Sequence, residues 1–147
     1  MLAHAQPQPE SEATPEALSD DEAVRATITA LFDGMRASDS DAVGAIFHAN
    51  ATLQSVSATG SGSFQIQGGE IDGFVASIGG APEGALDEKV GEVTVQIDDG
   101  LAHAWMDYEF YYQGQRSHCG VNSIQLVKVA DDWQILNVVD TRRRDCE

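Results

Sequence analysis

The sequence is short of basic residues and has no long apolar run. Among its 147 residues, 24 are acidic and only 8 are lysine or arginine, which gives a formal net charge of −16 at pH 7. Nucleic acids and anionic membranes both attract basic patches, so this charge argues against either as a partner. A transmembrane helix needs about 20 consecutive apolar residues, and no stretch of the chain approaches that length. What remains is an acidic globular protein with 42% hydrophobic residues.

Cysteine is also scarce. The chain has only Cys119 and Cys146, whereas a structural zinc site commonly uses four Cys or His ligands at short spacings. His48 and His103 each lack a second ligand nearby in the sequence, and no glycine-rich phosphate loop is present. We therefore expect no metal and no cofactor. Cys119 and Cys146 would pair in an oxidising compartment and stay free thiols in a reducing one, and their spacing leaves both states open.

The N-terminal stretch is polar and rich in proline. We expect a disordered tail over residues 1–18 and a single folded domain over residues 19–147. Within the tail, Ala3-His4-Ala5 fits the small-x-small pattern of a signal-peptide cleavage site. If it is a remnant of such a site, the protein is periplasmic or secreted; if the tail is an ordinary one, the protein is cytoplasmic. The sequence leaves both localisations open.

The first half of the chain carries helical patterns. Ser19 followed by Glu22 is a capping box, and an apolar stripe then predicts an amphipathic helix from about Asp20 to about Ala37. A brief second helix is expected to end near His48-Ala49-Asn50. A third is predicted from Glu70 to Ile78, where two glycines stop it.

The rest of the chain reads as strands. Alternating residues around a Gly/Ser-rich turn predict a hairpin over residues 52–67, and "APEGALDE" reads as a loop. Tight turns then separate four long strands, which form an antiparallel meander. These strands are Lys89–Ile97, Leu101–Tyr112, Arg116–Val129 and Trp133–Thr141. We predict an α+β fold in which a curved antiparallel sheet wraps around three N-terminal helices. Such a cone-shaped roll leaves a cavity for a small ligand.

The stretch RSHCGVNSIQ, residues 116–125, has the highest density of side chains that could take part in catalysis or ligand binding. Side chains of a strand alternate between its two faces, so His118, Gly120 and Asn122 share one face and Cys119 lies on the other. This alternation argues against a joint His–Cys nucleophile or metal site. His118 and Asn122 are candidates for a polar pocket wall, or for a hydrogen-bonded pair inside the sheet. A glycine in the middle of a strand, as at Gly120, indicates a bulge or a close approach by another group.

The last strand ends on a second polar cluster. Asp140 and Arg142 share a face if the strand continues, and a carboxylate buried in the cone could act as a general base. The alternative is a salt bridge between Asp140 and the adjacent arginines that holds the C-terminus. The strand that contains Trp105 and Tyr108 has aromatic residues on both faces. We therefore expect one face to pack on the helices and the other to form a homodimer through the sheet.

Three stretches carry a resemblance to a known superfamily. They are "DEAVRATITALFDGMRASD", "VGAIFHANATL" and "AHAWMDYEFYYQGQRSHCGVNSIQLVKVADDWQILNVVDTRRRDC". Together they resemble the nuclear transport factor 2-like superfamily, and within it the SnoaL-like and "putative lumazine-binding" branch, over about residues 20 to 146. The superfamily uses one scaffold for isomerases, dehydratases, cyclases and plain binding modules, so the resemblance predicts the fold more sharply than the function.

The resemblance also implies roles for individual residues. An Asp or His that projects into the cone serves as general acid or base in the enzymes of the superfamily, and here the candidates are His118 and Asp140. The expected contacts to a small, possibly heterocyclic or aromatic organic ligand are Asn122, Tyr108, Trp105, Phe47 and Arg142. Because no strict match to a known catalytic pattern is present, the first interpretation is a small-molecule-binding protein. The alternative is an isomerase, dehydratase or cyclase that works on a small cyclic substrate.

Overall fold

The computed structural model describes residues 17–147, in which three helices and a seven-stranded sheet follow the predicted order. Most of the expected tail, with Ala3-His4-Ala5, lies outside the described residues. The elements are α1 (Asp20–Arg36), α2 (Ser40–Ala45), β1 (Phe47–Ala58), β2 (Phe64–Glu70), α3 (Asp72–Gly79), β3 (Leu86–Val90), β4 (Thr94–Asp98), β5 (Leu101–Tyr112), β6 (Gln115–Val129) and β7 (Asp132–Arg142).

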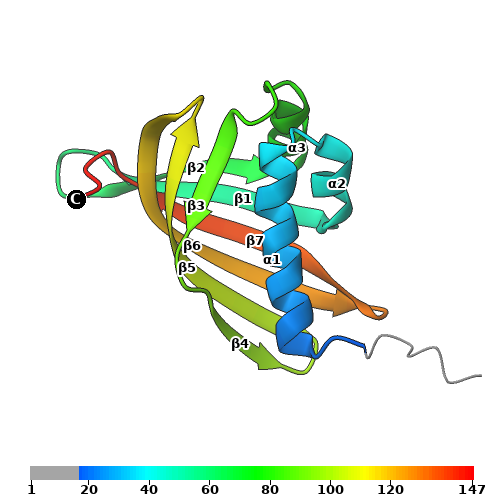
Figure 1. Ribbon diagram of the computed structural model, residues 1–147. Helices are drawn as coiled ribbons and strands as arrows, with labels where there is room; N and C mark the ends of the chain where they lie inside the picture. The colour runs from blue at the N-terminus through cyan, green and yellow to red at the C-terminus, as the bar shows by residue number, and fades with distance from the viewer. Residues whose placement is uncertain (1–16) are drawn as a thin grey trace, which may run out of the picture.

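The sheet curves around the helices, as Figure 1 shows. Its strand order is β2-β1-β7-β6-β5-β3, and β4 also pairs with β5. All neighbours are antiparallel except β1 and β7, which run parallel. α1 lies across the concave face, and α2 and α3 sit together at one end of the cone. The concave face is thus covered by helices and the opposite face is left without a helical layer.

α1 forms where the capping box and apolar stripe predict it. The Ser19 hydroxyl accepts a hydrogen bond from the Glu22 backbone N–H, and the Glu22 carboxylate accepts one from the Ser19 N–H. The helix buries Val24, Ile28 and other stripe residues against the sheet. Its first turn is tied to the strands because Asp20 accepts hydrogen bonds from side chains of β6 and β7. The predicted start and apolar face of this helix are confirmed.

Two predicted boundaries are wrong. The second helix ends at Ala45, and residues 47–50 begin β1 instead of closing the helix. The strand expected over Lys89–Ile97 is two strands, β3 and β4, and β3 already begins at Leu86 inside the stretch read as a loop. Charged residues at three successive positions hid the beginning of this strand.

The break between β3 and β4 is a one-residue bulge. Val90 pairs with Tyr108, and Thr94 pairs with Trp105. The three residues 91–93 between β3 and β4 therefore lie opposite only two residues of β5, 106 and 107. An extra residue bends and twists the bulged strand, which lets this edge follow the curvature of β5. Gly91 sits in the bulge and its N–H donates to the Asp107 carbonyl.

Among residues 17–147, none of the helices has the length and apolar character that crossing a bilayer requires. The homodimer expected through the sheet stays a prediction. The face it would use carries half-exposed aromatic and aliphatic side chains such as Trp105 and Leu101.

Candidate functional site

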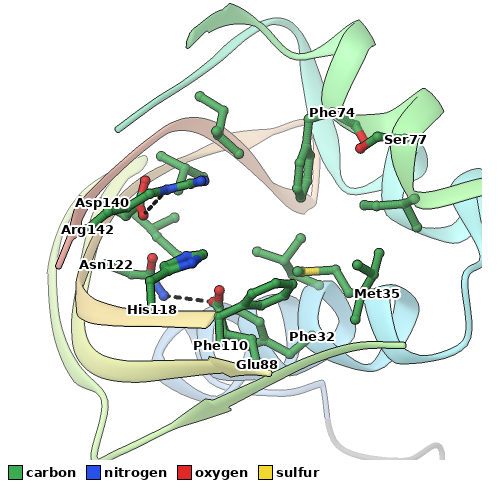
Figure 2. Close-up of a pocket in the computed structure, with 16 residues that line it drawn as sticks. Phe32, Met35, Phe74, Ser77, Glu88, Phe110, His118, Asn122, Asp140 and Arg142 are labelled. Carbon is green, nitrogen blue, oxygen red and sulfur yellow. Dashed lines mark hydrogen bonds and ion pairs between the residues drawn. The ribbon is translucent and has the colours of Figure 1, made fainter. Parts of the chain in front are cut away.

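A cavity of about 200 Å³ lies between the helices and the concave face of the sheet. Its lining residues come from α1, α3 and the five strands β1, β7, β6, β5 and β3, and Figure 2 shows them converging on the cavity. They are Leu31, Phe32, Met35, Leu53, Phe74, Ser77, Ile78, Leu86, Glu88, Phe110, His118, Asn122, Ile124, Val138, Asp140 and Arg142. The apolar side chains come equally from the helices and from the strands, whereas every polar or charged one except Ser77 comes from a strand. The cavity therefore has a helix side that is apolar apart from Ser77 and a sheet side that carries the polar groups.

The apolar side is rich in aromatic rings. Phe32 and Met35 project from α1, Phe74 projects from α3, and Phe110 closes the cavity from β5. Phe47 lies behind Phe74 in an edge-to-face contact with ring centroids 6.2 Å apart. The rings of Phe32, Phe74 and Phe110 in the lining favour a ligand with its own ring system, because aromatic pairs gain beyond the apolar area they bury.

The polar side begins with a pair of residues from two strands that both pair with β5. Glu88 on β3 accepts a hydrogen bond of 3.0 Å at Oε2 from the Asn122 amide on β6. Burial raises the pKa of Glu88 to about 7, and the nearby Asp140 charge adds to this, while the Asn122 hydrogen bond and Arg142 oppose it. At neutral pH Glu88 therefore divides between acid and carboxylate, which is the condition for giving and taking a proton.

Asp140 has a different environment. Its Oδ1 accepts a hydrogen bond of 2.5 Å from the Ser55 hydroxyl on β1, and its Oδ2 lies 2.7 Å from the Tyr108 hydroxyl and 3.1 Å from Arg142 Nε. A carboxylate offers about four acceptor positions, and three of them are occupied here. The aspartate, which is only 6% exposed, thus mainly joins β5, β7 and β1 and has little capacity left for a ligand.

His118 is the third polar group of this side. Its ring lies tilted against Phe110 at 5.1 Å between centroids and edge-on to Tyr108 at 5.7 Å. Nδ1 is 3.0 Å from the Ser117 hydroxyl. Burial lowers the pKa of His118, the charges of Arg142 and Arg144 lower it further, and Asp140 opposes them. These effects favour the neutral imidazole, whose other nitrogen is left as a hydrogen-bonding group.

Gly120 explains the geometry of this part of β6. A Cβ at this position would collide with the Thr141 backbone carbonyl on β7. The absence of a side chain allows the close approach of the two strands that the sequence indicated. Just beyond it, Cys119 and Cys146 form a disulfide, which ties the residues after β7 to β6.

Of the five predicted ligand contacts, the structure places some in the cavity lining and others outside it. Asn122 and Arg142 line the cavity, but Tyr108 lies behind Asp140 and does not line it. Trp105 lies on the opposite face of β5 and is half-exposed, because it alternates with the inward-facing side chains of that strand. Phe47 also lies outside the lining, as the support of an aromatic ring on α3. Tyr108, Trp105 and Phe47, which were expected as ligand contacts, therefore all lie outside the lining of this cavity.

The sequence interpretation missed Glu88. One signal was available: Leu86, Glu88 and Val90 alternate like the inward face of a strand, with a single carboxylate between two apolar residues. In the structure, Glu88 on β3 is paired with Phe110 on the neighbouring strand β5. Among residues 17–147, no group of three or more His, Cys, Asp or Glu side chains has the geometry to hold a metal ion.

Comparisons with known proteins agree with this architecture. A model of the family described as "Putative lumazine-binding" matches residues 19–139. No curated protein matches the sequence.

Solved structures share the fold at low sequence identity. An NTF2-like protein of unknown function from Shewanella baltica OS155 is 17% identical with a TM-score of 0.68, over 88% of this chain and 100% of that chain. A "putative dehydratase from the NTF2-like family" from Streptomyces avermitilis is 15% identical with a TM-score of 0.63, over 85% and 97%. A protein of unknown function with a cystatin-like fold from Nostoc punctiforme is 12% identical with a TM-score of 0.62, over 87% and 96%. These likenesses confirm the predicted fold class.

Proposed function

Since the chain belongs to the family described as "Putative lumazine-binding", within the nuclear transport factor 2-like superfamily, we propose that it binds a small organic molecule in the cavity between the helices and the sheet. The single observation that carries this proposal is the two-sided lining of the cavity. Helix side chains that are apolar apart from Ser77 form one wall, and the sheet forms the other, where Glu88, Asn122 and His118 stand among further apolar residues. Pockets of this kind take ligands with an apolar body and a few fixed polar groups.

The lining also limits the charge of the bound ring system. Glu88 and Asp140 both line the cavity, so an anionic group buried beside them would meet like charges at low dielectric. Glu88 as an acid donates a hydrogen bond and as a carboxylate accepts one. The proposed ring system is therefore flat, carries no negative charge and has a hydrogen-bonding edge.

A fluorescent probe tests this proposal. N-phenyl-1-naphthylamine is uncharged and aromatic, and we expect its fluorescence to rise on binding with a single-site titration curve. Ser77→Trp puts a large side chain at the cavity lining without removing a core residue, and we expect it to weaken binding at least tenfold. The matched control is Ala76→Trp, on the same helix but outside the cavity lining, which should bind the probe as wild type does. Equal binding by Ser77→Trp and wild type would contradict the proposal.

A second candidate function, proton transfer on a cyclic ketone, is favoured by the raised pKa of Glu88, about 7. In this version the Glu88 carboxylate takes a proton from a carbon next to a carbonyl, which leaves an enolate, and then returns the proton to the same or a neighbouring carbon. No other reactant is needed. The observation favours Glu88 as the base over Asp140, whose acceptor positions are already largely occupied.

Hydrogen exchange on a model ketone separates binding from catalysis. We expect wild type to accelerate exchange of the α-protons of 2-tetralone in deuterated water, followed by NMR, with a rate that rises as pH passes through about 7. Glu88→Gln should abolish the acceleration and keep N-phenyl-1-naphthylamine binding. If wild type gives no acceleration while the probe binds, the protein is a binding module and the enzymatic candidate is wrong.

A further inference from the structure

A second, more open hollow adjoins the cavity. It is lined by Ser57, Ala58, Phe110, Ser117, His118, Arg142, Arg143, Arg144 and Asp145. Phe110, His118 and Arg142 line both spaces, so the two hollows meet at these three side chains. We call the second hollow the vestibule. It lies at the end of the cone where β1 and β7 finish, since Ser57 pairs with Arg142 there.

The vestibule concentrates positive charge on a strongly negative protein. Arg142, Arg143 and Arg144 are three of only 8 basic residues in a chain with net charge −16. Within residues 17–147, Arg142 pairs with Asp140, whereas neither Arg143 nor Arg144 takes part in an ion pair. The guanidinium charges of Arg143 and Arg144 are thus available to a partner from solution, with Asp145 as the acidic residue beside them.

The arginine segment is held in place by covalent and backbone contacts. The Cys119 N–H donates to the Arg143 carbonyl, and the Arg143 N–H donates to the Cys119 carbonyl, each at 2.9 Å. The Cys119–Cys146 disulfide closes the far end of the segment. A fixed segment loses less conformational entropy when it binds than a free chain terminus would, so its charges are better preorganised for a ligand.

We propose that the cavity and the vestibule form one composite site for an elongated aromatic anion, with the ring system in the cavity and a carboxylate, sulfonate or phosphate group beside Arg143 and Arg144. This inference rests on the proposed function and adds the charge and orientation of the ligand. The anionic group stays outside the cavity, away from Glu88 and Asp140, and the arginines offset the repulsion that the acidic surface exerts on any approaching anion. Arginine is suited to the role because its planar guanidinium binds oxyanions in a bidentate fashion.

Two probes that differ in one group test the inference. 8-Anilinonaphthalene-1-sulfonate has the ring system of N-phenyl-1-naphthylamine plus one sulfonate. We expect wild type to bind the sulfonate probe more tightly than the neutral one, and added salt to weaken only the sulfonate probe. The double variant Arg143→Gln/Arg144→Gln should bind the sulfonate probe about tenfold more weakly, since each exposed charge contact contributes modestly, and should leave the neutral probe within twofold of wild type.

The control variant removes the same charge elsewhere. Arg25→Gln/Arg116→Gln deletes two arginines that pair with Asp21 and Glu109 outside both hollows. It should bind both probes as wild type does. An equal loss in the control would show a general effect of net charge and overturn the inference.

The two proposals fail in different ways. If Ser77→Trp leaves binding of the neutral probe unchanged, the proposed function is wrong and the inference falls with it. If the neutral probe requires the open cavity but the vestibule double variant binds the sulfonate probe like wild type, the inference alone is wrong. Equal weakening of both probes by the double variant also overturns it, because the arginines would then support the fold and not the anion.

Discussion

The raised pKa of Glu88 predicts how the stability of the fold changes with pH, and this prediction can be tested without a ligand. Its pKa rises from an ordinary value of 4.5 to about 7 in the folded protein, with burial as the largest cause. The fold therefore favours the protonated acid. The stability associated with this residue is fully present below pH 4.5, where both folded and unfolded chains are protonated, and is lost as the pH rises through 7.

The size of the effect follows from the shift. At about 1.36 kcal/mol per pKa unit, the full shift corresponds to about 3 kcal/mol. As the pH rises from 5 to 8, the free energy of unfolding should fall by about 2.5 kcal/mol of this total. Water that enters the cavity screens part of the charge, which leaves about 2 kcal/mol.

Glu88→Gln measures this directly. Glutamine keeps an oxygen to accept the hydrogen bond from Asn122 and carries no charge at any pH. In urea unfolding, we expect the variant to gain about 2 kcal/mol over wild type as the pH goes from 5 to 8. Glu92→Gln, which removes an exposed carboxylate in the bulge between β3 and β4, should follow the wild-type pH dependence. If wild type and Glu88→Gln lose stability in parallel, the reasoning about burial is refuted.

Three further predictions concern the strands behind the cavity. Gly120→Ala forces a methyl group into the Thr141 carbonyl and should destabilise the fold by about 2 kcal/mol or more in urea unfolding, because backbone cannot easily yield; a near-neutral result would contradict the close approach. Replacing both Cys119 and Cys146 by alanine opens a link across a sequence separation of 27 and should cost about 3.5 kcal/mol by the loop-entropy relation, a loss that a reducing agent should reproduce in wild type but not in the variant. Tyr108→Phe removes a donor to the buried carboxylate of β7 and should cost about 2 kcal/mol; an unchanged unfolding midpoint would show that the hydroxyl is not needed there.

Local patterns predicted the elements whose partners are close in the chain. The capping box set the start of α1, and tight turns set β5, β6 and β7, since each signal lies within a few residues of the feature it specifies. Alternation along β6 put His118 and Asn122 on one face, and both line the cavity. The disulfide was left open between two redox states, because spacing alone does not say whether Cys119 and Cys146 meet.

The polar side of the cavity depends on contacts that local patterns do not encode. Asp140 meets Ser55 from 85 positions away through the parallel pairing of β1 with β7, which no turn specifies, and it meets Tyr108 from 32 positions away across β6. The sequence patterns did not identify Glu88 as a cavity residue for a different reason. It lies between Asp87 and Lys89 in a charged run typical of a loop, and the bulge after Val90 shifts the alternation by one residue.

The parallel pairing of β1 with β7 has a consequence for synthesis. β1 comes early in the chain, yet the strand that it pairs with on its inner side is the last to be made. During translation the helices and the first hairpin emerge with no sheet to pack on, and pairings this distant in sequence form slowly. We infer that the nascent chain exposes the apolar stripe of α1 until β7 has left the ribosome. Chains that stop before β7 should therefore depend on chaperones or aggregate, and the cavity is completed only when β7 is in place.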